Sequence, residues 1–421
     1  MFRKIILPNG LRLITVPQKE TKAVTLLILV GTGSKYETKD IMGISHFLEH
    51  MFFKGTKKRP TPIKVTEVID RVGGICNAFT SQDYTGYWAK VDASHFDLAL
   101  DWVSDIFLNS LLSPKEIEKE KGVVIEEINM YRDTPMRHIE EMWPALLYGD
   151  QPAGWDIAGT KESVHSLTRA DFLGYMQRQY VVSNTIVCVA GNIDGDKVAR
   201  KVEQSFRGIS DSPFQKRSKV VEHQTAPAVA LEFRKTDQTH IAIGSRAWNL
   251  FHPQRFTQEV LANILGGMMS SRLFVEVREK LGLAYRISTQ SETNPDTGWV
   301  VTIAGLKNEF VEKAIKVILK EYKRIAEVKV GPRELNKAKD HLIGEMTLRL
   351  ESSDEKASFY GFQEILEKRI LTPEKVYAKI KEVTAEDVSL LAKEIFRPER
   401  LNLAVLGPFQ EKTRFEQLLS L

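Results

Sequence analysis

The sequence predicts an α+β protein built from two halves of similar size, and three observations support this. The chain has 421 residues, more than the roughly 250–300 residues that one hydrophobic core usually organises. Strand-like runs alternate along the chain with longer runs of helical periodicity. A polar stretch rich in turn-forming residues separates two series of such runs, and it covers residues 208–227.

The first half opens with two strand-like runs, residues 11–16 (LRLITV) and 24–30 (VTLLILV), which are separated by a polar turn. We then expect, in order, a helix, a strand, a helix and a core strand over residues 41–54, 84–91, 96–108 and 184–190.

The second half repeats this order of elements. Strands are predicted over residues 228–233 and 239–243, and a long helical pattern follows over residues 254–265. The boundaries are therefore expected at 1–207 for the N-terminal domain, 208–227 for a linker and 228–421 for the C-terminal domain. The similar order suggests a duplication, although no residue-level repeat proves it.

Composition excludes several classes of protein. Hydrophobic residues at 43% and charged residues at 27% are ordinary for a globular chain. The net charge of +4 is small, and the basic residues are dispersed among acidic ones, so we expect no nucleic-acid partner.

The cysteines and the apolar runs limit the chemistry and the location. Cys76 and Cys188 form no CxxC pair, so a zinc site would have to use histidines and carboxylates. The apolar run before the Pro-Asn-Gly turn at residues 8–10 is three residues long, too short for a signal-peptide core. The most apolar stretch, residues 23–30, is too short to span a bilayer. We therefore expect a cytoplasmic protein without a membrane partner.

The chemistry is concentrated at residues 46–50 (HFLEH). On a helix, His46 and His50 lie one turn apart on one face, and Glu49 points to the same side. A catalytic zinc takes three protein ligands and leaves one position open for water, and a nearby carboxylate can take that water's proton. The pattern matches the inverzincin order HxxEH. Short His/Glu patterns also arise by chance, so a third ligand is required.

The third ligand is predicted on a helix that begins near residue 114. Ser113, Pro114 and Glu116 form a capping-box pattern with proline at the first helical position. The helix should run to about Tyr131.

The register of that helix directs two acids inward. Glu120 and Glu127 fall within its apolar stripe, whereas Glu126 points to the opposite side. An unpaired inward carboxylate is unfavourable, so the simplest interpretation is that Glu127 binds a cation. Glu120 would then accept a hydrogen bond from a liganding histidine or help to orient the site. Two core-edge glutamates paired with Lys or Arg are the alternative.

At this point the chain resembles the pitrilysin/insulinase metallopeptidases, in particular the branch that includes the mitochondrial processing peptidase and its bacterial relatives. The matching segments lie in both halves, and they are GISHFLEHM at 43–51, KGT at 54–56, GG at 73–74, NAFT at 77–80, residues 120–127, and Arg278 with EKLGLAY at 279–285. Glu127 follows His50 by 77 residues, which agrees with the family's spacing of its third ligand.

The resemblance implies a fold and an activity. The two halves would have the same fold and face each other as a clamshell around an enclosed cavity, with one zinc ion per chain in the N-terminal half. The protein would be a zinc-dependent endopeptidase that hydrolyses extended, unstructured peptides, with a zinc-bound water activated by Glu49 attacking the scissile carbonyl.

The resemblance also implies substrate contacts. The strand at residues 77–80 would pair with the extended peptide, which makes Asn77, Ala78 and Phe79 substrate contacts. Phe53 would line the pocket for the residue after the scissile bond.

Arg278 and Tyr285 match a pair that reaches the substrate from the second half, with the tyrosine donating to the developing oxyanion. On the residues alone, this pair would be an ordinary helix end and turn.

Two other functions stay open. A noncatalytic subunit would have lost the motif, which is intact here, and a peptide-binding protein with structural zinc would usually close its site with four ligands. Peptides are the expected partners. A homodimer is the expected assembly, and a heterodimer with a related subunit is the alternative.

Overall fold

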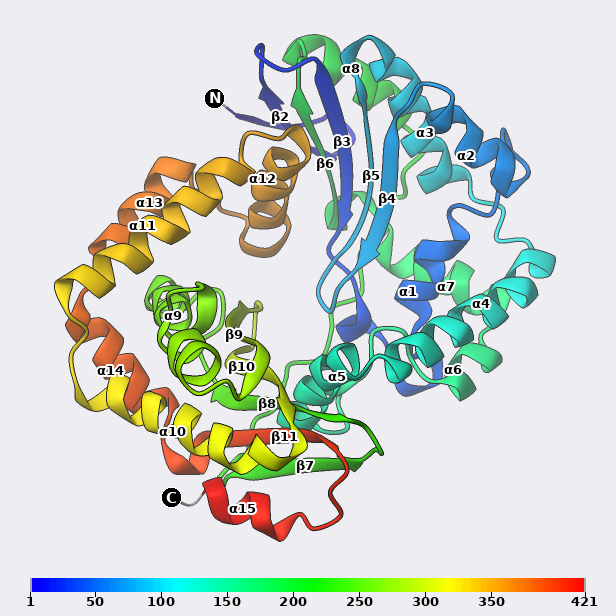
Figure 1. Ribbon diagram of the computed structural model, residues 1–421. Coiled ribbons are helices and arrows are strands. Elements are labelled where there is room, and N and C mark those ends of the chain that lie inside the picture. Colours follow the sequence, from blue (N-terminus) through cyan, green and yellow to red (C-terminus); the bar gives the residue numbers. More distant parts are fainter. Residues whose placement is uncertain (1, 420–421) are drawn as a thin grey trace. The chain divides into compact units, whose positions relative to one another are not determined.

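The computed structural model of the protein describes residues 2–419 (Figure 1). Two compact units make up this part of the chain, and neither is continuous in sequence. The first unit comprises Met1–Asn129, Trp155–Ser218 and Thr347–Ile370, and the second comprises Met130–Gly154, Lys219–Met346 and Leu371–Leu421.

A six-stranded mixed sheet organises the first unit, in the order β1-β2-β6-β3-β5-β4. The strands are β1 (Arg3–Ile6), β2 (Arg12–Pro17), β3 (Ala23–Val30), β4 (Ile75–Thr80), β5 (Thr85–Asp92) and β6 (Thr185–Gly191). The β2–β6 pair is parallel and the other neighbours are antiparallel. Strand β4 lies at one edge of this sheet.

The sheet of the second unit has five strands in the order β7-β11-β8-β10-β9. They are β7 (Ala228–Phe233), β8 (Gln238–Arg246), β9 (Ala284–Thr293), β10 (Gly298–Lys307) and β11 (Leu401–Gly407). Only β7 and β11 are parallel. Strands β2 to β6 of the first sheet have the same order and directions, so the two sheets share one topology.

Alternation along β3 separates two cores in the first unit. Leu26, Ile28 and Val30 face one core and Leu27 and Leu29 face the other, as the period of two in a strand requires. Both faces are covered, which explains why this run is apolar except for Thr25.

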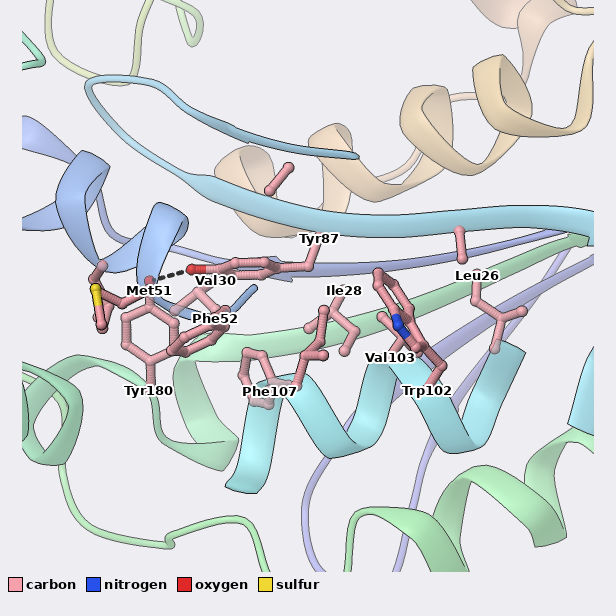
Figure 2. Packing of buried hydrophobic residues seen from close by; sticks show 14 of the residues in the cluster. Leu26, Ile28, Val30, Met51, Phe52, Tyr87, Trp102, Val103, Phe107 and Tyr180 are labelled. Atoms are coloured by element: carbon pink, nitrogen blue, oxygen red, sulfur yellow. Dashed lines mark hydrogen bonds between the residues drawn. The ribbon is translucent and has the colours of Figure 1, made fainter. Parts of the chain in front are cut away.

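Helix α3 (Phe96–Asn109) covers the first of these faces. Figure 2 shows Trp102, Val103 and Phe107 of this helix packed against Leu26 and Ile28. All five side chains are at most 2% exposed.

Helix α12 (Ser353–Glu367) covers the opposite face of the same sheet, although it lies far along the chain (Figure 1). Gly361 makes the close approach possible, since a Cβ there would lie 2.9 Å from Leu29 and 3.0 Å from Cys188. In the second unit, α5 (Pro135–Tyr148) packs Ile139, Trp143 and Leu147 onto β8, β10 and β11.

The remaining α-helices surround these layers. They are α1 (Ile44–Met51), α2 (Pro62–Asp70), α4 (Pro114–Asp133), α6 (Lys161–Ser166), α7 (Arg169–Gln179), α8 (Gly195–Ser205), α9 (Arg255–Ala262), α10 (Val311–Glu327), α11 (Pro332–Arg349), α13 (Pro373–Glu382), α14 (Ala385–Ile395) and α15 (Thr413–Leu419). No described helix is both long and apolar enough to cross a membrane.

The predicted elements exist, but some boundaries differ. The helix expected over 41–54 is shorter, α1, because Gly43 adopts a left-handed φ of 87° immediately before it. The pattern over 254–265 is α9 followed by a π-helical turn at Asn263–Gly267. Residues 211–227 form no helix or strand, and the domain boundaries at 207 and 228 stay a prediction.

Candidate metal centre

Helix α1 is amphipathic and directs the polar side chains of the HFLEH segment away from the core. Ile44, Phe47, Leu48 and Met51 are fully buried. His46, Glu49 and His50 lie on the other side and are partly buried, as the 3.6-residue period requires. The histidine rings meet edge to face, with centroids 4.7 Å apart.

A buried carboxylate holds the N-terminus of α1. Glu37 accepts hydrogen bonds from the backbone N–H groups of Gly43 at 2.7 Å and Ser45 at 2.9 Å, which satisfies two donors that the helix leaves open. Burial raises the pKa of Glu37 to about 7, against the opposing effect of its hydrogen bonds. Gly43 is required here because a Cβ would lie 2.5 Å from the carbonyl oxygen of Ala158.

Helix α4 supplies the acids in the predicted register. It begins at Pro114, and Ile117, Val124 and Ile128 are buried along one stripe with Glu120. Glu127 is 21% exposed at its side chain, and Glu126 is exposed.

His46, His50 and Glu127 form a possible metal site, with one ligand atom of each lying within 4.8 Å of the others. Oε2 of Glu127 lies 3.3 Å from Nε2 of His50 and 3.6 Å from Nε2 of His46. Ligand atoms about 2.0–2.1 Å from a tetrahedral zinc would stand roughly 3.3 Å apart. Two imidazoles and one carboxylate at this spacing fit a zinc ion with one coordination position left for water.

Glu120 lies directly behind His50, as predicted. Nδ1–H of His50 donates to Oε1 of Glu120 at 2.9 Å, and Nζ of Lys54 lies 2.7 Å from Oε2. Burial raises the pKa of Glu120, but its hydrogen bonds with His50 and Lys54 dominate, so the pKa is lowered and the side chain is held as a carboxylate. This fixes the tautomer of His50 and turns Nε2 toward Glu127.

The two histidines differ electrostatically. Burial lowers the pKa of His46 to about 4, and the charge of His50 adds to this effect. Burial also lowers the pKa of His50, but its hydrogen bonds with Glu120 and Glu127 raise it more strongly, to about 9. Positive charge is therefore favoured between the two glutamates, as expected where a cation binds.

Glu49 is held by a residue from the sheet. The hydroxyl of Thr80 donates to Oε2 of Glu49 at 2.6 Å. Burial raises the pKa of Glu49, against the effect of this hydrogen bond. A carboxylate with a raised pKa beside a metal site is suited to accept a proton.

The expected substrate contacts lie on and near the sheet edge. Asn77, Ala78 and Phe79 belong to β4, which pairs with β5 on one side only. The ring of Phe79 lies 6.1 Å from that of Tyr84. Phe53 packs beside Trp102, with ring centroids 6.0 Å apart. Their roles toward a substrate stay a prediction.

Arg278 and Tyr285 belong to the second unit. Arg278 lies in the π-helical segment Phe274–Lys280, and its guanidinium lies 4.7 Å from the ring centre of Phe274 and 5.4 Å from that of Tyr285. Tyr285 is 81% exposed on β9. The two predicted residues thus lie together, and their role in catalysis stays a prediction.

Three residues that contact this centre were not predicted as site residues. Lys54 follows His50 by four residues and could have been found from helical spacing. Thr80 belongs to the NAFT segment, which was expected to pair with a peptide, but nothing in that segment indicates its contact with Glu49. Glu37 contacts the N-terminus of α1 from outside the helix, and no local pattern marks it.

Comparison with known proteins assigns both parts of the chain. Residues 12–161 match the family model of insulinase (peptidase family M16), and residues 166–342 match that of the peptidase M16 inactive domain. An uncharacterized zinc protease of Bacillus subtilis is 33% identical over 408 residues, which cover 97% of this chain and 98% of that protein.

Two solved structures have the same fold. A protease from Helicobacter pylori has a TM-score of 0.90 at 23% identity, covering 97% of this chain and 100% of that one. A chain of complex III2 from Candida albicans has a TM-score of 0.85 at 18% identity, covering 99% of each chain.

Proposed function

Since the chain belongs to the insulinase family of zinc proteases (peptidase family M16), we propose that it is an endopeptidase that hydrolyses extended, unstructured peptides with one zinc ion per chain. The observation that carries this proposal is the convergence of His46, His50 and Glu127 with Glu49 on the same helix face as both histidines.

The side chains divide the chemistry among them. A bound zinc supplies Lewis acidity, which lowers the pKa of a water molecule and polarises a carbonyl. His46, His50 and Glu127 hold the ion, and Glu120 orients His50. Glu49 takes a proton from the water that attacks the scissile carbonyl and then delivers it to the leaving amine.

The open edge of β4 supports a preference for extended peptides. An extended chain can add to a sheet edge through backbone hydrogen bonds, which gives affinity with little sequence selectivity. Asn77, Ala78 and Phe79 would make these contacts, and Phe53 would favour an apolar residue after the scissile bond. Compact folded proteins cannot present such a strand.

The second unit contributes to the transition state in this proposal. The two units would enclose the substrate as a clamshell, and the Tyr285 hydroxyl would donate to the developing oxyanion while Arg278 binds a peptide carbonyl. The exposure of Tyr285 and its stacking with Arg278 leave the hydroxyl accessible to a substrate.

A homodimer is the proposed assembly, and a heterodimer with a related subunit is the alternative. The similar chain in complex III2 of Candida albicans belongs to a multi-subunit assembly. Size-exclusion chromatography with light scattering separates these possibilities. A cytoplasmic location stays a prediction.

The test of the function is cleavage of an internally quenched, unstructured peptide. We expect fluorescence release that a chelator abolishes and zinc restores. The Glu49→Gln variant should retain zinc and lose turnover, whereas His46→Ala, His50→Ala and Glu127→Ala should lose zinc. A zinc-loaded wild-type protein that binds peptides without cutting them would support a noncatalytic binding protein instead.

A further inference from the structure

We propose that Thr80 is a positioning residue that fixes the orientation of the Glu49 carboxylate. This inference rests on the proposed role of Glu49 as the general base. Among the described residues, Thr80 is the side chain that donates a hydrogen bond to Glu49.

The pleat of β4 places Thr80 on the correct face. Side chains two residues apart lie on the same side of a strand, so Thr80 shares a face with Ala78. Ala78 is 8% exposed and belongs to the core cluster that contains Phe47, Leu48 and Met51 of α1. The hydroxyl of Thr80 is therefore directed toward the helix that carries Glu49.

The hydrogen bond is short enough to restrict the carboxylate. At 2.6 Å it falls within the range for a hydroxyl donating to an ionised oxygen, a type about twice as strong as a neutral hydrogen bond. Glutamate has three rotatable side-chain bonds and, without a partner, populates several rotamers. Binding Oε2 to Thr80 selects one of them and leaves Oε1 to accept the proton.

The position of Thr80 links this orientation to the substrate strand. Thr80 is the last residue of β4 and lies opposite Thr85 of β5. The Thr85 hydroxyl donates to the carbonyl of Thr32 at 2.9 Å and is fully buried, which anchors this end of the hairpin. Strand β4, which we propose as the docking strand for the peptide, thus also orients Glu49. The same backbone therefore positions both the peptide and the general base.

The test compares two substitutions at position 80 in the full-length, zinc-loaded protein. Thr80→Val keeps the shape and removes the hydroxyl, and we expect kcat to fall about 10–100-fold, the range for losing a partner that orients a group at a metal site. KM and the dissociation constant for zinc should stay close to wild type, because neither the ligands nor the β4 backbone changes. Thr80→Ser restores the hydroxyl and should restore most of kcat.

Thr25→Val is the matched control. It removes a buried threonine hydroxyl from β3 of the same sheet, where it bonds to the hydroxyl of Ser353 at 2.8 Å, so it should lower thermal stability without lowering kcat. If Thr80→Val does not fold, Thr80→Ala removes the same hydroxyl with less demand on packing.

The outcomes distinguish this inference from the proposed function. An unchanged kcat in Thr80→Val, no rescue by Thr80→Ser, or loss of zinc in Thr80→Val would overturn the positioning role while leaving the peptidase assignment intact. A wild-type protein that binds zinc and cuts no peptide would refute the proposed function itself.

Discussion

At the scale of single residues, the register of α4 decides which acid can bind a metal. Successive residues on a helix are rotated by about 100°, so Glu126 and Glu127 face different surroundings. Glu127 lies beside both histidines, whereas Glu126 is exposed and accepts a hydrogen bond from Asn129 at 3.2 Å.

The first prediction follows from this difference. Glu126→Ala should keep zinc and activity, with stability changed by less than about 0.5 kcal/mol as at ordinary surface sites. Glu127→Ala should lose zinc because one of three ligands is missing. Metal analysis of both purified variants tests this, and the opposite pattern would show that Glu126 is the ligand.

The second prediction concerns Glu120. Glu120→Gln should weaken zinc binding or activity about 10–100-fold, because an amide no longer gives His50 and Lys54 an ionised partner. Competition with a zinc chelator measures the affinity. Glu118→Gln on the exposed side of α4 is the control, since Glu118 pairs with Lys121 of the same helix and its side chain is 70% exposed. Equal zinc affinity in the Glu120→Gln and Glu118→Gln variants would show that Glu120 does not support the metal site.

At the scale of elements, the helix that carries the proposed metal-binding histidines, α1, depends on a residue outside it. The residue at the N-cap of α1 makes no side-chain capping hydrogen bond. Glu37, nine residues before His46, instead accepts hydrogen bonds from the backbone N–H groups at this end of the helix. Ser45, whose N–H donates to Glu37, also bonds through its hydroxyl to Tyr175 at 2.7 Å, so this end of α1 is tied to α7 as well.

The third prediction is a pH dependence carried by Glu37. Its pKa rises from 4.5 to about 7 on folding because of burial, so the folded state binds more protons between these values. The contribution to stability is present below about pH 4.5 and is lost as pH rises through about 7, by up to roughly 3 kcal/mol. Compared with Glu37→Gln, which does not titrate, the wild type should lose thermal stability between pH 5 and pH 8. An equal difference in melting temperature at both pH values would contradict this.

At the scale of the whole molecule, one topology is used twice with different chemistry. Strands β2–β6 and β7–β11 share order and direction, but His46, His50 and Glu127, the residues that could hold a metal ion, belong to the first unit. We propose that the second unit instead supplies groups that contact the substrate, namely Tyr285 and Arg278.

The fourth prediction tests that contribution. Tyr285→Phe removes one exposed hydroxyl and should lower kcat by about 10²–10³-fold, the range for losing one oxyanion donor, with zinc content unchanged. Tyr377→Phe, also in the second unit, is the control. An unchanged kcat in Tyr285→Phe would mean that the transition state is stabilised without this residue.

The fifth prediction concerns the substrate. Unfolded peptides should be cut and a stably folded domain spared, since a docking strand must be extended. Gel analysis of one protein in its folded and unfolded forms tests this. Rapid cleavage of the folded form would contradict the proposed preference for extended chains.

The sequence by itself determined the features that depend on local periodicity. The 3.6-residue period placed His46, Glu49 and His50 on one face and separated Glu127 from Glu126, and strand composition located β3 and β6. These patterns reflect which side of an element is buried. Buried residues recur at every second position in a strand and at every third or fourth position in a helix, so the sequence alone reveals them.

Only the tertiary structure decided which distant segments meet. The pattern of an amphipathic helix shows that one side packs against an apolar surface, but it does not specify which surface. No local pattern therefore assigned α12 to the first sheet or α5 to the second. The same holds for Thr80 and Glu37, whose partners lie on another element. Hydrogen bonds between elements depend on packing distances that a one-dimensional pattern does not contain. His46, His50 and Glu127 could be proposed together from the sequence because the two histidines lie one helical turn apart and the glutamate lies on the apolar stripe of its helix.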